Sequence, residues 1–164
     1  MKSIRIWLLF FIISLLISGI TAFAPETGLR WLLSIWPAND SALYRWIQQS
    51  YLAVKVTNEQ FPSIAYGYDW LAFAHIVIAT VFIGPLRNPI RNVWVIQFGC
   101  IACAMIIPLA LIAGPLRQIP MFWQLIDCSF GVVGIIPLII CLRKIRQLGR
   151  KGLQEREHIT SLKK

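Results

Sequence analysis

Three ionisable side chains lie inside or beside long apolar runs of this sequence: Asp69, His75 and Asp127. An ionisable group at mid-bilayer costs about 2.5–3.5 kcal/mol on insertion scales, so such residues usually face other helices and find a partner. An imidazole held by a carboxylate has a fixed tautomer and can accept or pass on a proton. These three residues are therefore the candidate ligand or proton site.

The distance from the preceding tryptophan predicts that two of these residues lie at one depth. His75 follows Trp70 by five residues, about 7.5 Å along a helix, and Asp127 follows Trp123 by four residues, about 6 Å. Tryptophan prefers the headgroup level of a bilayer, so both residues should lie in its outer half. A contact between them would either fix the helix register or form a ligand or proton site with Asp69 at its mouth.

The four cysteines offer a second kind of chemistry. Cys100 and Cys103 form a C-x-x-C pair, which is similar to the motif of membrane thiol oxidoreductases of the vitamin K epoxide reductase class. Cys100 lies about 9 Å along a helix from Trp94, far from an oxidising outer face. We therefore expect all four, including Cys128 and Cys141, to be small apolar side chains, with thiol redox chemistry at Cys100 and Cys103 as the weakest alternative.

Composition places these residues in a membrane protein. Hydrophobic residues make up 57% of the chain and charged residues 14%, against about 25% charged residues in a soluble domain. Four apolar runs are long enough to cross a bilayer, and each opens near a tryptophan; the predicted spans are about 6–24, 69–86, 93–113 and 122–142. The predicted fold is all-α: a polytopic four-transmembrane-helix bundle, with residues 1–142 as a single membrane domain.

The first apolar run has a second interpretation. Ala22, Phe23 and Ala24 match the small-residue pattern of a signal-peptide cleavage site. Pro25 would then directly follow the cut and block the peptidase. We therefore expect an uncleaved first helix.

Residues 25–66 are expected to form a short amphipathic extracytoplasmic segment. The turn at 37–40 offers Asp40 as an N-cap, and a helix should follow from Ser41 to about Val56. Apolar side chains recur on one side of that helix: Leu43, Trp46, Ile47, Tyr51 and Val54. The segment should cap the bundle or lie in the membrane interface.

The lysines and arginines predict the orientation. Twelve of them lie in the segments that share a side with the N-terminus and four lie on the opposite side. Positive charge accumulates on the cytoplasmic side, so both termini should be cytoplasmic, in a bacterial inner membrane.

The tail at 143–164 should lie along anionic lipids at the cytoplasmic face, with its helix broken at Gly149. Its candidate headgroup contacts are Arg143, Lys144, Arg146, Arg150 and Lys151. The formal net charge of +9 follows from this topology, and no motif for reading a nucleic-acid groove is present.

Small residues predict where the last two spans touch, because they let helix backbones approach closely in a membrane. They are Gly99, Ala102 and Cys103 on the third span, and Gly131 and Gly134 on the fourth.

The shortage of reactive side chains favours a non-catalytic protein: an accessory, scaffold or assembly subunit, with a membrane protein or a second copy of the chain as its partner. The alternative is a protein that binds a lipid or a small hydrophobic ligand, or a lipid-phase enzyme, with its site at His75 and Asp127. No catalytic residue or cofactor is assigned, and no cluster has the spacing of metal ligands.

Overall fold

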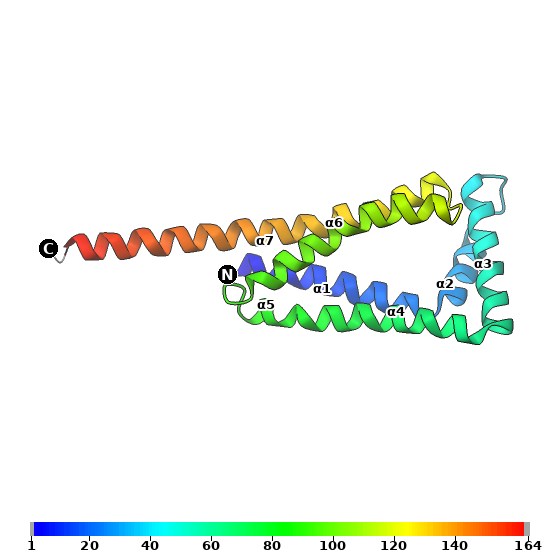
Figure 1. Cartoon of the computed structure of the whole chain (residues 1–164), viewed down its shortest axis with the longest axis horizontal. Coiled ribbons are helices and arrows are strands. Elements are labelled where there is room, and N and C mark those ends of the chain that lie inside the picture. The colour runs from blue at the N-terminus through cyan, green and yellow to red at the C-terminus, as the bar shows by residue number, and fades with distance from the viewer. Residues whose placement is uncertain (1, 163–164) are drawn as a thin grey trace. The chain divides into compact units, whose positions relative to one another are not determined.

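The computed structural model describes residues 2–162, with side chains described for residues 2–150. That part of the chain folds into helices joined by short turns (Figure 1). They are α1 (Lys2–Ala22), α2 (Pro25–Ile35), α3 (Ala42–Gln60), α4 (Pro62–Val81), α5 (Ile83–Arg87), α6 (Val93–Leu116) and α7 (Met121–Leu162). Among the residues that the structure describes, four segments are long and apolar enough to cross a membrane: Lys2–Ala22, Pro62–Arg87, Val93–Leu116 and Met121–Arg150. The predicted all-α fold with four spans is confirmed.

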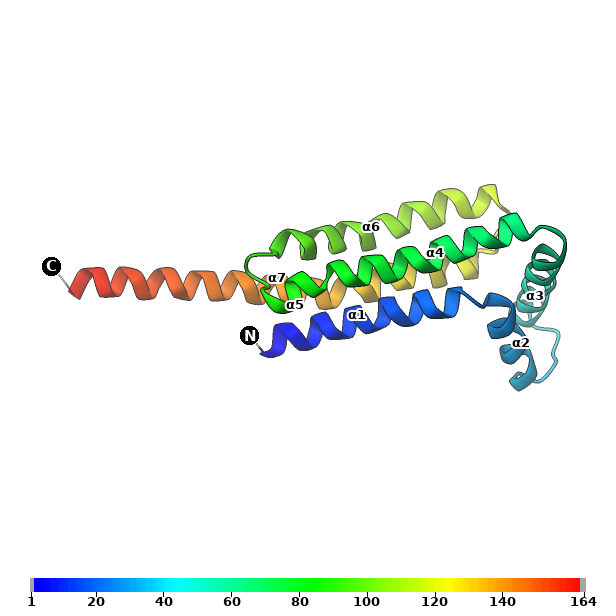
Figure 2. The same cartoon turned by 90° about the horizontal axis from the view of Figure 1, so that it is seen from below.

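The chain divides into two compact units. The first, which we name the hairpin unit, comprises Met1–Ile12 and Thr80–Lys164. Within it α6 and α7 run antiparallel, side by side (Figures 1 and 2). The second, which we name the corner unit, comprises Ile13–Ala79. It holds the end of α1, all of α2 and α3, and most of α4.

Glycines set the contact between α6 and α7. A Cβ added at Gly131 would lie 2.5 Å from the carbonyl oxygen of Cys103, and one added at Gly134 would lie 3.0 Å from the sulfur of Cys103. A Cβ on Gly99 would lie 2.7 Å from the ring of Phe82. Close approach at these small residues is confirmed, while Ala102 is exposed instead of facing α7.

Large apolar side chains fill the rest of the hairpin unit. Phe82 and Leu138 are fully buried, and the ring of Phe82 packs on Phe11 of α1 with a centroid distance of 4.8 Å. Near the start of α1, the Cys141 thiol donates to the carbonyl oxygen of Ile4 over 3.6 Å. The first turns of α1 are thus held against α7.

The corner unit owes its name to two turns with the same backbone geometry. Ala24, between α1 and α2, has φ −130° and ψ 59°, and Phe61, between α3 and α4, has φ −132° and ψ 60°. Each precedes a proline, and a residue before proline is disfavoured in the helical region. Pro25 and Pro62 then begin the next helix, where their fixed φ fits and no N–H is needed.

These corners turn the α2–α3 pair across the direction of α4 (Figure 1), and α2 and α3 pack against each other. The α1 and α4 helices meet at Gly19, where an added Cβ would lie 2.9 Å from the carbonyl oxygen of Ala72. The corner unit therefore consists of the end of α1 and most of α4, with the α2–α3 pair laid across them.

The α3 helix begins one residue later than predicted and ends four residues later. Ser41, not Asp40, is its N-cap, because the Ser41 hydroxyl accepts a hydrogen bond from the backbone N–H of Tyr44 over 3.2 Å. On the predicted apolar side Ile47 is 3% exposed and the other four residues are half-buried, whereas Arg45 is exposed.

Two further boundaries differ from the prediction. The α4 helix begins at Pro62, so Trp70 lies in its third turn and not at its start. The α7 helix continues through Gly149 to Leu162. One glycine costs a helix only about 1 kcal/mol relative to alanine, and the arginine, lysine and leucine around Gly149 are good helix formers.

Large apolar side chains cover the outer faces of the spans. Leu109, Ile112 and Phe130 are 64–66% exposed, while small residues lie at the helix contacts. Helices surrounded by lipid are packed in this way, because lipid tails solvate leucine as well as a protein interior does.

Candidate functional site

His75 lies where α4 approaches α1. A Cβ on Gly19 would lie 3.1 Å from the Cβ of His75, so the imidazole leaves α4 next to the α1 backbone. Its Nδ1–H donates to the carbonyl oxygen of Leu71, one turn earlier on α4, over 2.8 Å. A carbonyl can only accept, so this bond places the hydrogen on Nδ1 and leaves the Nε2 lone pair available in neutral histidine.

Asp127 lies in the second turn of α7, in the hairpin unit, and is half-buried. Within the described part of that unit its carboxylate has no hydrogen bond or ion pair. His75 belongs to the corner unit, so its pairing with Asp127 stays a prediction.

The two cysteines of the C-x-x-C pair form no disulfide. Cys100 is half-buried and Cys103 is buried, with its sulfur beside Gly134. Cys103 therefore serves packing between α6 and α7.

The predicted headgroup contacts at the end of α7 differ in environment. Arg143, Arg146 and Arg150 are exposed, as a contact with lipid phosphates needs. Lys144 is half-buried and donates to the Ser3 hydroxyl of α1 over 2.8 Å. Lys151, the fifth of these residues, has a side chain that lies outside the described part of the structure.

A buried amide that the sequence analysis missed fixes the turn between α6 and α7. Gln124 is 3% exposed, and its Nε2 donates to the carbonyl oxygen of Ile119 over 2.7 Å. Its side chain occupies the space beside Gly114, where an added Cβ would lie 2.5 Å from Cδ. Gln124 thereby holds the tight turn in which Gln118 has a φ of 57°.

Asp69, the third predicted residue, lines a pocket at the corners of the corner unit. The pocket has a volume of about 300 Å³, and the α1–α2 turn, the first turn of α2, the last turn of α3 and the second and third turns of α4 contribute to it. We name it the acidic pocket; its lining residues are Phe23, Ala24, Pro25, Glu26, Thr27, Asn58, Ala65, Tyr68 and Asp69.

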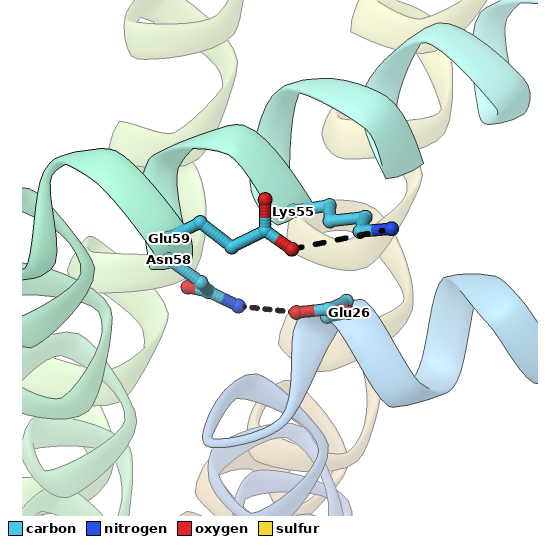
Figure 3. Close-up of polar contacts among 4 residues, drawn as sticks. All are labelled: Glu26, Lys55, Asn58 and Glu59. Carbon is cyan, nitrogen blue, oxygen red and sulfur yellow. Dashed lines mark hydrogen bonds and ion pairs between the residues drawn. The ribbon is translucent and has the colours of Figure 1, made fainter.

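One hydrogen bond ties the walls of the acidic pocket together. The Asn58 side chain of α3 donates to the Glu26 carboxylate of α2 over 2.7 Å (Figure 3). Glu26 also lies in the first turn of α2, where a negative charge is favourable beside the free N–H groups of the helix. Glu59, next to Asn58, instead lies along α3 with an oxygen 4.0 Å from the Lys55 ammonium.

Sequence reasoning found Asp69 but not its neighbours in the pocket. Glu26 and Asn58 are 32 residues apart, and the packing of α2 against α3 brings them together. One signal in the sequence marks the two corners that border the pocket. It is the proline that follows Ala24 and the proline that follows Phe61, each at the start of a helix.

Comparison with protein-family models, with curated proteins and with solved structures gives no match for this chain.

Proposed function

We propose that the chain is a non-catalytic integral membrane protein that acts as an accessory, scaffold or assembly subunit. The observation that supports this best is the contact of α6 with α7, where Gly131 meets the Cys103 backbone at a distance that leaves no room for a methyl group. Such a contact holds α6 and α7 in a fixed position. An accessory subunit needs a rigid surface of this kind to bind its partner. Cys103 and Gln124 of this hairpin serve the same packing.

The proposed location is a bacterial inner membrane with both termini in the cytoplasm. Support comes from the twelve basic residues on one set of segments against four on the other. The exposed arginines near the end of α7 would then lie at the anionic cytoplasmic surface, where each contributes about 1 kcal/mol of attraction.

The proposed partner is a membrane protein or a second copy of the chain. In this proposal, exposed apolar side chains of α2 contribute to the contact with the partner: Trp31 is 64% exposed and Ile35 is 58% exposed. They are four residues apart on one helix and hence on one face.

The size of the assembly tests the proposal. We expect the protein, extracted from its native membrane in a mild neutral detergent, to migrate on a native gel as a defined assembly larger than one chain in a micelle. Gly131→Leu should abolish that assembly, because it forces α6 and α7 apart, whereas His75→Ala and Asp127→Asn should preserve it.

Two results would contradict this role. One is a monomer under every mild extraction condition. The other is a loss of the cellular phenotype in His75→Ala or Asp127→Asn while the assembly persists, which would favour the alternative ligand site or lipid-phase enzyme.

A further inference from the structure

The acidic pocket continues into a second hollow with a different lining. This hollow, which we name the aromatic groove, has a volume of about 290 Å³ and is lined by Phe23, Tyr66, Asp69, Trp70 and Phe73. Phe23 and Asp69 line both hollows. A ligand can therefore place one end in the acidic pocket and the other along the groove.

Charge determines which end enters the acidic pocket. Of the described residues, those that line it include two carboxylates, Glu26 and Asp69, and no lysine, arginine or histidine. Glu26 is compensated by the Asn58 amide and by the start of α2. The half-buried Asp69 carboxylate has no hydrogen bond or ion pair within the described corner unit. A bound cation beside Asp69 would supply the missing partner.

The aromatic groove suits the apolar remainder of such a ligand. Tyr66, Trp70 and Phe73 follow one another along α4 in edge-to-face contacts, with centroid distances of 5.9 Å and 6.2 Å. These rings are 50–59% exposed, so a ligand can reach them. Aromatic faces also attract ammonium groups, so these rings favour a cationic ligand over an anionic one.

The position of the groove indicates where the ligand comes from. Trp70 and Phe73 belong to a helix that is apolar enough to cross the membrane, so the groove opens toward lipid and not only toward water. We propose that the acidic pocket and aromatic groove together bind a membrane lipid whose headgroup ends in a primary ammonium. The ammonium lies between Asp69 and Glu26, where its three N–H donors meet carboxylate oxygens, and the apolar part of the lipid lies along Trp70 and Phe73. This site goes beyond the scaffold role proposed above and does not depend on it.

Native mass spectrometry of the full chain in neutral detergent tests the proposal. The probes are phosphatidylethanolamine, phosphatidylcholine and phosphatidylglycerol with identical acyl chains. We expect phosphatidylethanolamine to bind at least about tenfold more tightly than phosphatidylglycerol, with phosphatidylcholine between them because its quaternary ammonium donates no hydrogen bond.

Paired variants locate the binding. Asp69→Asn should lower the affinity for phosphatidylethanolamine by about tenfold and leave phosphatidylglycerol unchanged, as expected for one charge-assisted contact. Glu59→Gln is the matched control, because it removes a carboxylate near Asn58 that does not line the pocket. Phe73→Ala should weaken all three lipids by a similar factor, since it removes apolar contact area and no charge.

Three results would overturn the proposal. The first is equal binding of phosphatidylglycerol and phosphatidylethanolamine, and the second is an Asp69→Asn protein that binds like the wild type. The third is displacement of the lipid by free ethanolamine at the lipid's own concentration, which would make this a site for a soluble amine. Asp69 makes no contact that asparagine would lose, so Asp69→Asn should fold, and an unchanged elution volume in size-exclusion chromatography checks this.

Discussion

Replacing Gly131 by alanine should destabilise the hairpin unit, although alanine is the better helix former. The added methyl carbon would lie 2.5 Å from the carbonyl oxygen of Cys103 and 3.3 Å from the Cβ of Ile106. Backbone cannot rotate out of the way as a side chain can. The two helices must therefore separate by about 0.9 Å to restore the ordinary contact distance of 3.4 Å.

The cost of this separation follows from the contacts around it. A gap of 0.5–1 Å loses about a quarter to a half of the dispersion energy of each atom pair that it opens. Overpacking in a well-packed core typically costs about 1–3 kcal/mol. For a chain of this length, 1 kcal/mol corresponds to about 2–4 °C in Tm, so a cost of about 1–3 kcal/mol should lower the Tm of Gly131→Ala by about 2–12 °C.

The assay uses the protein's own cysteines. Cys103 and Cys141 are buried, so a maleimide dye that fluoresces on reaction with thiols reports their exposure as the purified protein is heated in detergent. Gly149→Ala is the matched control, because a Cβ at Gly149 has nothing within 4 Å. It should leave Tm unchanged or raise it, since alanine is favoured over glycine in a helix by about 1 kcal/mol. A Gly131→Ala protein with a Tm equal to or above that of Gly149→Ala would refute the close contact of α6 with α7.

Two further predictions concern the start of α3 and the core of the hairpin unit. Ser41→Ala should destabilise the first turn of α3 by about 1 kcal/mol through loss of the N-cap, while Asp40→Ala should have no such effect; hydrogen exchange of the amides in that turn measures the difference, and equal protection in both variants would contradict the cap. Phe82→Ala should cost about 3–5 kcal/mol because the ring is fully buried, whereas Phe130→Ala should cost far less because its ring is 64% exposed; comparable losses of Tm in the two variants would contradict the assigned core.

The spans were predictable because their signal lies in composition. The length of an apolar run identifies a membrane segment, and no knowledge of the contacts between helices is needed. The contact of α6 with α7 was also predictable, since glycine in an apolar run has few uses other than close approach. Gly131 and Gly134 make that contact, while Ala102 does not.

Boundaries were less predictable because neighbouring residues compete for the same role. Asp40 and Ser41 are both good N-caps, and the difference of one position depends on where the turn at 37–40 places the backbone. The second span was predicted from residue 69, yet α4 begins at Pro62, because proline fits the first turn of a helix. Gly149 also reads as a break, but one glycine is too small a penalty to end a helix of good helix formers.

The residues of the candidate site also differ in how well the sequence predicted them. Asp69 was found because a carboxylate at the edge of an apolar run is costly and needs a partner. Its neighbours Glu26 and Asn58 were missed, because they lie in polar stretches where such residues are ordinary. The pairing of His75 with Asp127 rests on equal depth along two helices, and depth does not determine which faces meet.

Thiol labelling of intact cells tests the central claim, a four-span membrane protein with α2 and α3 on one side and the basic end of α7 on the other. In a background without native cysteines, Asn39→Cys in the turn before α3 and Arg150→Cys on α7 are each treated with a maleimide that does not cross membranes. We predict that Asn39→Cys is labelled in intact cells and that Arg150→Cys is labelled only after the membrane is opened. Labelling of both from outside, or recovery of the chain in the soluble fraction without detergent, would contradict the account.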